Sequence, residues 1–273
     1  MITKVTIFAK VSRTTPIMKK LITSLSIILI SFSSYTQMGS LSLTFGLPQN
    51  EFRENTDATG FGGDLSLAFP FQKGVPIYLG GDINYMVYGL NSQDHDLTAE
   101  IVANGQVIDE LIIPLTVTNT NSIFGTHLFM RAVAPFELIQ PYAEGLIGFR
   151  YISTNTKIID RSDDRRWADD DDSDVISRKT VLDDWIFSYG YGGGFLIKVG
   201  PSVFVDLRAD FFKGQRAQYY DGDDTESWTV EFNGDPNNYD RDTVTGDDLS
   251  YENQPRESTT DLLVLKFGVA FKI

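Results

Sequence analysis

The feature that most constrains this chain is a period-two alternation of apolar residues with small or charged ones, repeated in eight segments. It is clearest in the last segment, LLVLKFGVAFKI, at residues 262–273. There Leu265 and Phe267 alternate with Lys266 and Gly268. Because successive side chains of a strand point to opposite faces, such a segment predicts a β-strand with one apolar face and one small or polar face.

The other seven segments show the same alternation. They are SLSLTFGL, FGGDLSLAF, IYLGGDINYMVY, FGTHLFMRA, YAEGLIGFRY, WIFSYGYGGGFLIKV and VFVDLRADF, which begin at residues 40, 61, 77, 124, 142, 185 and 203. Their ionisable residues fall on the non-apolar face, which gives the set Asp64, Asp82, His127, Arg131, Glu144, Arg150, Asp206, Arg208 and Asp210, with Lys266 from the last segment. A soluble sandwich also alternates, so the connections must decide the orientation of the faces.

Short and long connections alternate strictly along the chain. PFQKGVP, APFELIQP and GPS are the short ones, and the long ones cover about residues 48–58, 91–119, 154–183 and 214–258. This is the pattern of an outer-membrane barrel, with short periplasmic turns and long extracellular loops. The predicted fold is therefore all-β, an eight-stranded antiparallel transmembrane β-barrel with its apolar face toward lipid. A soluble, lipocalin-like barrel is the alternative, and it would need its apolar face inside.

One segment leaves the strand count open. IVANGQVI, at residues 101–108, places Asn104 and Gly105 between apolar residues, which is a hairpin signal. If this hairpin crossed the membrane, the barrel would have ten strands. Its arms are shorter than the roughly 9–11 residues of a spanning strand, so the hairpin is expected to stand outside the membrane.

The amino terminus predicts export. In MKKLITSLSIILISFSSYTQ, residues 18–37, two lysines precede a twelve-residue apolar stretch, and Ser34 and Thr36 are suitably small for cleavage before Gln37. This is a secretory signal peptide, too short for a transmembrane helix. Residues 1–36 are assigned to it, with 1–17 interpreted as an extension upstream of the true start, and residues 37–273 are assigned to the barrel. The expected location is the cell outer membrane.

Removing the leader changes the net charge from −14 to −19, since the leader carries five basic residues and no acid. Much of this charge lies in two long loops: nine acids and six bases in 154–183, and twelve acids and three bases in 214–258. The simplest interpretation is a solvated polar surface, because an unpaired charge is costly to bury. The alternative is weak calcium binding, since Ca²⁺ takes six to eight oxygens. The candidates are Asp169, Asp170, Asp171, Asp172, Asp174, Asp221, Asp223 and Asp224, none with EF-hand spacing.

On these alternating strands and links, residues 38–273 resemble the small OmpA/OmpX-like outer-membrane barrels of Gram-negative bacteria. The resemblance implies outer-membrane lipid as the surroundings and recognition of the last strand by the insertion machinery. In that family the last strand commonly ends in an aromatic residue, whereas here Ile273 is last and Phe271 precedes it on the same face. No soluble domain is expected after the barrel.

Little in the sequence favours catalysis. The chain has no cysteine and two histidines. His95 lies between Asp94 and Asp96 in a long loop, and a lipid A deacylase-like His-x-Ser pattern fails because Phe129 follows His127 by two positions. YGYGGGF, at residues 189–195, lacks the strand-then-helix context of a phosphate loop and fits a barrel wall with small inward residues.

The predicted function is therefore a non-enzymatic outer-membrane barrel with a structural or surface-interaction role through acidic extracellular loops. The alternatives are a narrow small-solute channel and a membrane-embedded hydrolase. An unknown extracellular ligand is a candidate partner, and the acidic balance argues against nucleic acid. No cofactor is expected beyond the weak calcium hypothesis. The five inward acids and four inward bases predict a paired charge network, because an ion-selective pore tends to carry one sign of charge.

Overall fold

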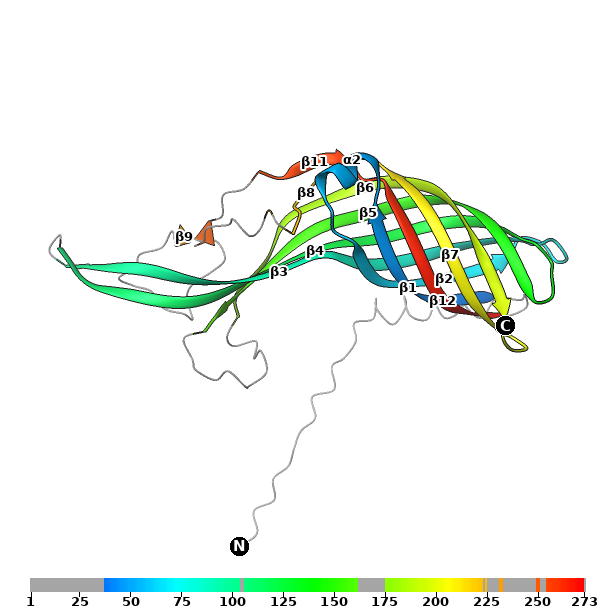
Figure 1. Cartoon of the computed structure of the whole chain (residues 1–273), viewed down its shortest axis with the longest axis horizontal. Helices are drawn as coiled ribbons and strands as arrows, with labels where there is room; N and C mark the ends of the chain where they lie inside the picture. Colours follow the sequence, from blue (N-terminus) through cyan, green and yellow to red (C-terminus); the bar gives the residue numbers. More distant parts are fainter. Residues whose placement is uncertain are drawn as a thin grey trace, which may run out of the picture.

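The chain forms a closed antiparallel β-barrel of eight strands in the order β1-β12-β7-β6-β5-β4-β3-β2 (Figure 1). The computed structural model describes residues 37–272 except 104–105, 162–174, 223, 225–230, 233–248 and 251–253. The signal peptide assigned to residues 1–36 therefore lies outside the described residues. Eight strands confirm the predicted fold class and exclude a ten-stranded barrel.

Four wall strands are short and four are long. The short ones are β1 (Met38–Pro48), β2 (Gly60–Pro70), β7 (Val203–Gly214) and β12 (Leu262–Lys272). The long ones are β3 (Ile77–Ala103), β4 (Gln106–Val133), β5 (Ile139–Asp160) and β6 (Val175–Lys198). Residues 71–76, 134–138 and 199–202 connect strands at one end, here called the turn end. The opposite end, called the loop end, carries the helix α2 (Asn50–Asn55), the hairpin of β8 (Arg216–Tyr219) and β11 (Arg256–Thr259), and the small pair β9 (Glu231–Phe232) and β10 (Leu249–Ser250).

The β3–β4 connection differs from the expected long link over about residues 91–119, because most of it is paired strand. β3 and β4 stay paired from Ile77 and Ala132 to Ala103 and Gln106, with a bulge between Val87 and Gly89, so the arms of the 101–108 hairpin continue the wall strands. Sequence alternation did not predict this continuation, because both faces of a strand can be polar once it leaves the membrane. The local signal is the β-branched run at Thr116, Val117 and Thr118, which favours extended structure.

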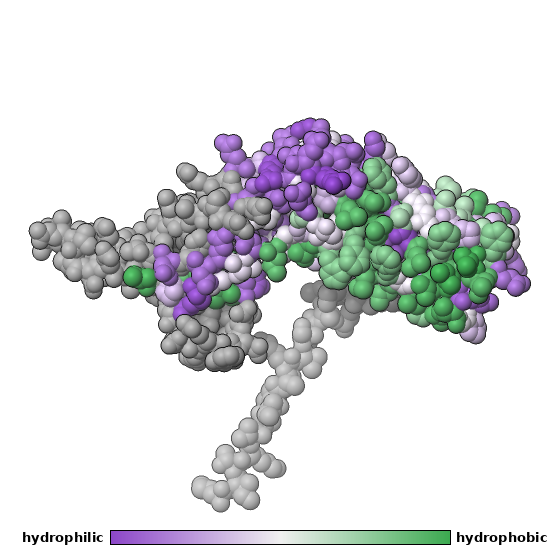
Figure 2. All heavy atoms as spheres, in the orientation of Figure 1, coloured by the Kyte–Doolittle hydropathy of each residue, from purple (hydrophilic) through white to green (hydrophobic). Residues whose placement is uncertain are grey.

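The wall separates an apolar outside from a polar inside, as the alternation predicts. Large apolar side chains exposed on the outer surface include Leu41, Leu43, Phe45, Phe61, Leu65, Leu67, Ile83, Leu128, Met130, Ile147, Phe149, Tyr191, Phe195, Phe267 and Val269. In Figure 2 they form a green surface over the wall strands, and hydrophilic residues cover the region of α2, β8 and β11. An outward apolar band around a polar interior is the arrangement of a barrel that spans a membrane.

Inward glycines provide space for large interior side chains. Gly192 lies between Glu144 on β5 and Asp210 on β7, and a Cβ atom at Gly192 would collide with the Asp210 carboxylate. A Cβ atom at Gly194 would crowd the Tyr142 ring at 2.7–2.8 Å. The narrow-wall interpretation of YGYGGGF is therefore supported by these contacts. Among the described residues, no helix is long and apolar enough to cross a membrane.

The apolar band predicts a depth-dependent cost for charge. Leu43 lies at the middle of β1 and is 56% exposed. The substitution Leu43→Arg should destabilise the barrel by about 2–4 kcal/mol, because Arg at the bilayer midplane costs this much. The measurement is the free energy of unfolding in lipid vesicles. The control is Thr118→Arg, on the part of β4 beyond the band, which should change it much less. Equal costs at both positions would contradict a lipid-facing outer surface.

Candidate functional site: a filled lumen and a loop-end cap

The centre of the lumen is a guanidinium surrounded by carboxylates. Arg208, whose side chain is fully buried, donates from Nη1 to Glu144 Oε1 at 3.3 Å and from Nη2 to Asp64 Oδ1 at 3.4 Å. Asp82, Asp206 and Asp210 approach the same guanidinium at 3.8–3.9 Å. Because these residues come from β2, β3, β5 and β7, one side chain ties separate parts of the wall together.

Lys266 forms the second centre, on the strand next to Arg208. Its Nζ donates to Asp64 Oδ2 at 2.9 Å and to Asp82 Oδ2 at 3.2 Å, and lies 3.1 Å from Asp210 Oδ2. Both charges of each pair are buried, so removal of one partner would leave the other without water to solvate it.

Towards the turn end, Arg131 extends the network. Its Nε donates to Glu144 Oε2 at 2.6 Å, and its guanidinium lies 4.8 Å from the Phe129 ring centroid and 4.2 Å from that of Tyr142. The Tyr142 hydroxyl donates to Asp206 Oδ1 at 2.6 Å. Tyr142 was not among the predicted network residues. It is an aromatic residue in an alternating wall segment, and nothing in that pattern indicates that its hydroxyl bonds to a buried carboxylate.

Arg150 is buried in the lumen but stands apart from the other predicted charges. Its Nη2 donates to the Thr260 carbonyl at 2.7 Å, and the guanidinium lies 5.8 Å from the Phe212 ring centroid. No carboxylate among the described residues lies within ion-pair distance of it. The structure thus places all ten predicted lumen residues inside the barrel, and contacts join nine of them into one cluster.

His127 makes an arrangement that resembles a nucleophilic triad. Its Nδ1 lies 3.1 Å from Asp82 Oδ1, and its Nε2 lies 2.8 Å from Ser188 Oγ. Sequence reasoning missed Ser188, which lies on a strand remote from His127 in the chain. Ser188 is 0% exposed and the imidazole lies 4.5 Å from the Phe212 ring, so a substrate has no approach to the hydroxyl. The arrangement therefore acts as a structural hydrogen-bond chain.

Apolar side chains close the lumen on both sides of the charges. Those on the loop side of the charged residues along their strands are Met86, Ile123, Ile152, Ile186, Phe212, Leu262 and Val264. Those on the turn side are Met38, Ala68, Val133, Leu196, Phe204 and Ala270. Since all of them are buried, the charges occupy a compartment between two apolar layers rather than the wall of an open passage.

A cap of α2, β8 and β11 covers the loop end. Phe52 of α2 is buried, with its ring centroid 5.0 Å from that of Tyr219 and 6.3 Å from that of Tyr88. Arg256 joins the parts of this cap: it donates to the Asn55 carbonyl, pairs with Asp224 at 2.6 Å and lies 3.4 Å from Asp221. Sequence reasoning predicted a long loop here and did not predict the cap.

Electrostatics stabilise the cap at neutral pH. Partial burial lowers the pKa of the Arg256 guanidinium, but its hydrogen bond to Asp224 and the charges of Asp224 and Asp221 outweigh this, so the pKa lies above its ordinary value. The Thr259 amide donates to Glu51 and lowers the pKa of that carboxyl. Arg216 also approaches Glu51 at 3.3 Å and Glu257 at 3.1 Å, in exposed pairs that contribute little each.

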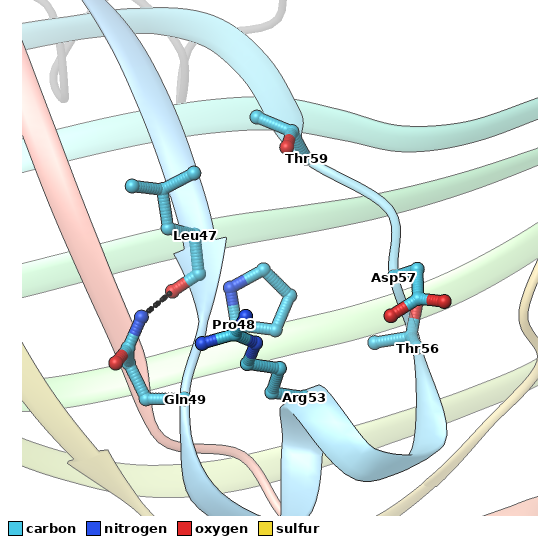
Figure 3. Close-up of a pocket in the computed structure, with 7 residues that line it drawn as sticks. All are labelled: Leu47, Pro48, Gln49, Arg53, Thr56, Asp57 and Thr59. Carbon is cyan, nitrogen blue, oxygen red and sulfur yellow. Dashed lines mark hydrogen bonds between the residues drawn. The ribbon is translucent and has the colours of Figure 1, made fainter.

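A small pocket lies beside the cap (Figure 3). It has a volume of about 330 Å³ and is lined by Leu47, Pro48, Gln49, Arg53, Thr56, Asp57 and Thr59. Gln49 bonds to the Leu47 carbonyl within it, and Thr56 is held by Asp221 at 2.5 Å. The pocket is therefore anchored to the cap, although its lining does not define a ligand class.

The described residues contain no cluster of ligands that would support the calcium hypothesis. Asp221 and Asp224 are taken up by Arg256 and Thr56, and the described part of the chain holds no group of three or more residues suited to a metal. Asp169, Asp170, Asp171, Asp172, Asp174 and Asp223 lie outside the described residues. The His95 side chain is also outside that description.

The chain shows a low likeness to several solved structures. No family model matches the chain, and no curated protein matches it. The solved structures include Ail, the attachment invasion locus protein of Yersinia pestis, in complex with sucrose octasulfate, at 9% identity, TM-score 0.37 and coverage of 87% of this chain and 97% of that chain. A major outer membrane protein from Thermus thermophilus has 11% identity, TM-score 0.38 and coverage of 88% and 100%. Neisserial surface protein A has 8% identity, TM-score 0.34 and coverage of 88% and 98%. The strand topology of this chain, rather than these likenesses, establishes its architecture.

The first site prediction concerns Arg208. Replacement by Ala removes the guanidinium shared by four aspartates and Glu144, and should lower the free energy of unfolding by about 3–5 kcal/mol because buried carboxylates lose their partner. The matched control is Arg161→Ala, which breaks an exposed 3.0 Å pair with Asp94 and should cost no more than about 1 kcal/mol. Denaturant titration in detergent gives both values, and similar small costs would contradict a central structural role for Arg208.

The second site prediction concerns the cap. Arg256→Met retains the aliphatic stem but removes the bonds to Asp224 and Asn55, so α2 and the β8–β11 hairpin should exchange amide hydrogens faster. The β1–β12 ladder of the wall should exchange at its original rate. Arg216→Met serves as the control, because its pairs are exposed. Unchanged exchange in α2 after Arg256→Met would show that Phe52 packing alone holds the cap.

Proposed function

We propose that this protein is a non-conducting outer-membrane barrel that acts as a rigid membrane platform for its loop-end structures. The role is structural or interactional, and the loop end is the contact surface. The observation that carries the proposal is the filled lumen, in which nine charged or ionisable side chains contact one another between apolar layers.

The membrane part of the proposal rests on the apolar outer surface. Closed barrels satisfy every wall hydrogen bond between strands and leave no open edge in lipid. We infer that the turn end is periplasmic and the loop end extracellular, because short periplasmic turns and longer extracellular loops characterise outer-membrane barrels. Outer-membrane lipid and the insertion machinery, acting on β12, are the partners this location implies.

The contact surface has two described parts. One is the cap, where Arg53, Asp57 and the neighbouring polar side chains line the pocket of Figure 3. The other is the extension of β3–β6 beyond the band, whose outer face carries Thr116 bonded to Asp94 and Thr118 bonded to Ser92. The cap is polar, whereas the outer face of the extension also carries exposed Leu90 and Ile112. Both parts are supported by backbone ladders, which suits recognition of an extracellular ligand or partner by a rigid surface.

The alternatives receive less support. A small-solute channel needs a continuous polar path, whereas Phe212 and Met86 lie on the loop side of the charges and Phe204 on the turn side. A membrane hydrolase needs an accessible nucleophile, and the Ser188 hydroxyl beside His127 is buried.

Planar-bilayer recording tests the proposal. Purified wild-type barrel should give no steady open-channel current, because an eight-stranded barrel has room only for the side chains that fill it. Replacing Arg208 by Ala, which removes the central guanidinium, should introduce intermittent current. The control is Thr118→Ala on the outer face of the extension, which should stay silent. A steady conductance through the wild type would refute the filled-lumen proposal and favour the channel.

A further inference from the structure

The charges enclosed in the lumen do not balance if every group carries its ordinary charge. Five carboxyl groups lie inside: Asp64, Asp82, Asp206, Asp210 and Glu144. Three permanent cations contact them: Arg131, Arg208 and Lys266. Arg150 is buried but stands apart from these carboxyls. All eight members of this cluster are at most 5% exposed. Their negative charges outnumber their positive charges between two apolar layers, which is a costly state in a low-dielectric interior.

Four of the carboxylates have hydrogen-bond donors suited to the ionised form. Asp64 receives bonds from Lys266 and Arg208, and Asp82 from Lys266, with His127 Nδ1 also within reach. Glu144 receives bonds from Arg131 and Arg208. Asp206 receives the Tyr142 hydroxyl. Charge-assisted bonds of this kind favour a carboxylate over its protonated form.

Asp210 is the exception. Neither of its oxygens accepts a hydrogen bond from a donor. Lys266 Nζ lies 3.1 Å from Oδ2, outside hydrogen-bond geometry, and is already bonded to Asp64 and Asp82. Arg208 Nη1 is 3.9 Å away and bonds instead to Glu144. An ionised Asp210 would therefore be the least stabilised carboxylate of the five.

Asp210 also lies near Glu144, whose carboxylate can accept a hydrogen bond from a protonated Asp210. Glu144 and Asp210 are the cross-strand neighbours of Gly192 from opposite sides, and the absent side chain at Gly192 leaves the space that the Asp210 carboxyl fills. Both carboxyls also approach the same nitrogen, Arg208 Nη1, which lies 3.3 Å from Glu144 Oε1 and 3.9 Å from Asp210 Oδ2. Two carboxyls that share one site hold a single proton more readily than two negative charges.

We propose that the lumen is a binding site for one proton, and that Asp210 holds it as a carboxylic acid that donates to Glu144. With this proton in place, four carboxylates face the three cations of the cluster, and Asp210 needs no cation of its own.

The groups that face Asp210 come from every neighbouring element. They are Glu144 on β5, Arg208 on β7 itself, Lys266 on β12, Asp64 on β2, and Asp82 on β3 with His127 on β4 behind it. Because the acids among them outnumber the cations, loss of the Asp210 proton would add a charge that no neighbour can match. The proton therefore belongs to the folded barrel as a structural component.

Infrared spectroscopy of the purified full-length barrel in vesicles at neutral pH is the direct test. Exposed acids are ionised at this pH, so a protonated buried carboxyl should appear as a separate C=O stretch that shifts in heavy water. Asp210→Asn should abolish this band, while Asp206→Asn should retain it. A wild-type spectrum without the band, or a band that survives Asp210→Asn, would overturn the proposal.

Thermal unfolding of matched variants gives an independent readout. Asparagine mimics a protonated aspartate in shape and charge, so Asp210→Asn should leave the unfolding midpoint close to that of the wild type. Asp64→Asn removes an ionised partner of both Lys266 and Arg208 and should lower the midpoint clearly. If Asp210→Asn lowered it as much as Asp64→Asn, Asp210 would be an ionised ion-pair partner and the proposal would be wrong. Failure of the bilayer experiment above would refute the closed lumen without changing the infrared band, so the two proposals can be distinguished.

Discussion

The narrow interior of a closed eight-stranded wall is the constraint on which the rest of this structure depends. Such an interior is only wide enough for side chains, so it must be filled, and filled with groups that satisfy one another. Arg208 contacts carboxyls from several strands at once, and Lys266 completes the set from the adjacent strand. Glycines such as Gly192 then become necessary in the wall, because long charged side chains from neighbouring strands occupy the space beside them.

Under the proposed function, filling the lumen in this way separates two roles of the molecule. The wall supplies membrane insertion through its apolar outside, while the segments that connect the strands at the loop end are free to serve recognition. The cap illustrates the second role, because Phe52 inserts its ring beneath α2 while Arg256 binds acids of the β8–β11 region at the surface. The wall is held together by contacts inside the lumen, which the loop-end segments do not share. Sequence variation at the loop end would therefore leave the wall intact.

Sequence reasoning predicted the parts of the structure that follow from alternation. Eight strands, the outward apolar set and the inward position of residues such as Asp64 and Arg131 all depend on a local period of two, which the chain displays directly. Three features required the folded structure. Ser188 and Tyr142 join the network through strand register, which alternation does not specify. The continuation of β3 and β4 has only short apolar runs, such as Leu115 and Val117 on β4, which do not by themselves distinguish a wall strand from a loop. The cap depends on tertiary contacts of Phe52 and Arg256, whose local sequence resembles an ordinary acidic loop.

The unequal strand lengths have a mechanical consequence. β3 and β4 pair from the turn end to the tip at Ala103 and Gln106, with register shifts between Val87 and Gly89 and between Ile101 and Val102. A force applied to that tip along the barrel axis would pull β3 and β4 together and load the β2–β3 and β4–β5 ladders in shear, with many hydrogen bonds sharing the tension at once. The same force applied across the axis would open the ladders one bond at a time. The molecule is therefore a stiff tether for axial pulling and a compliant one for sideways pulling.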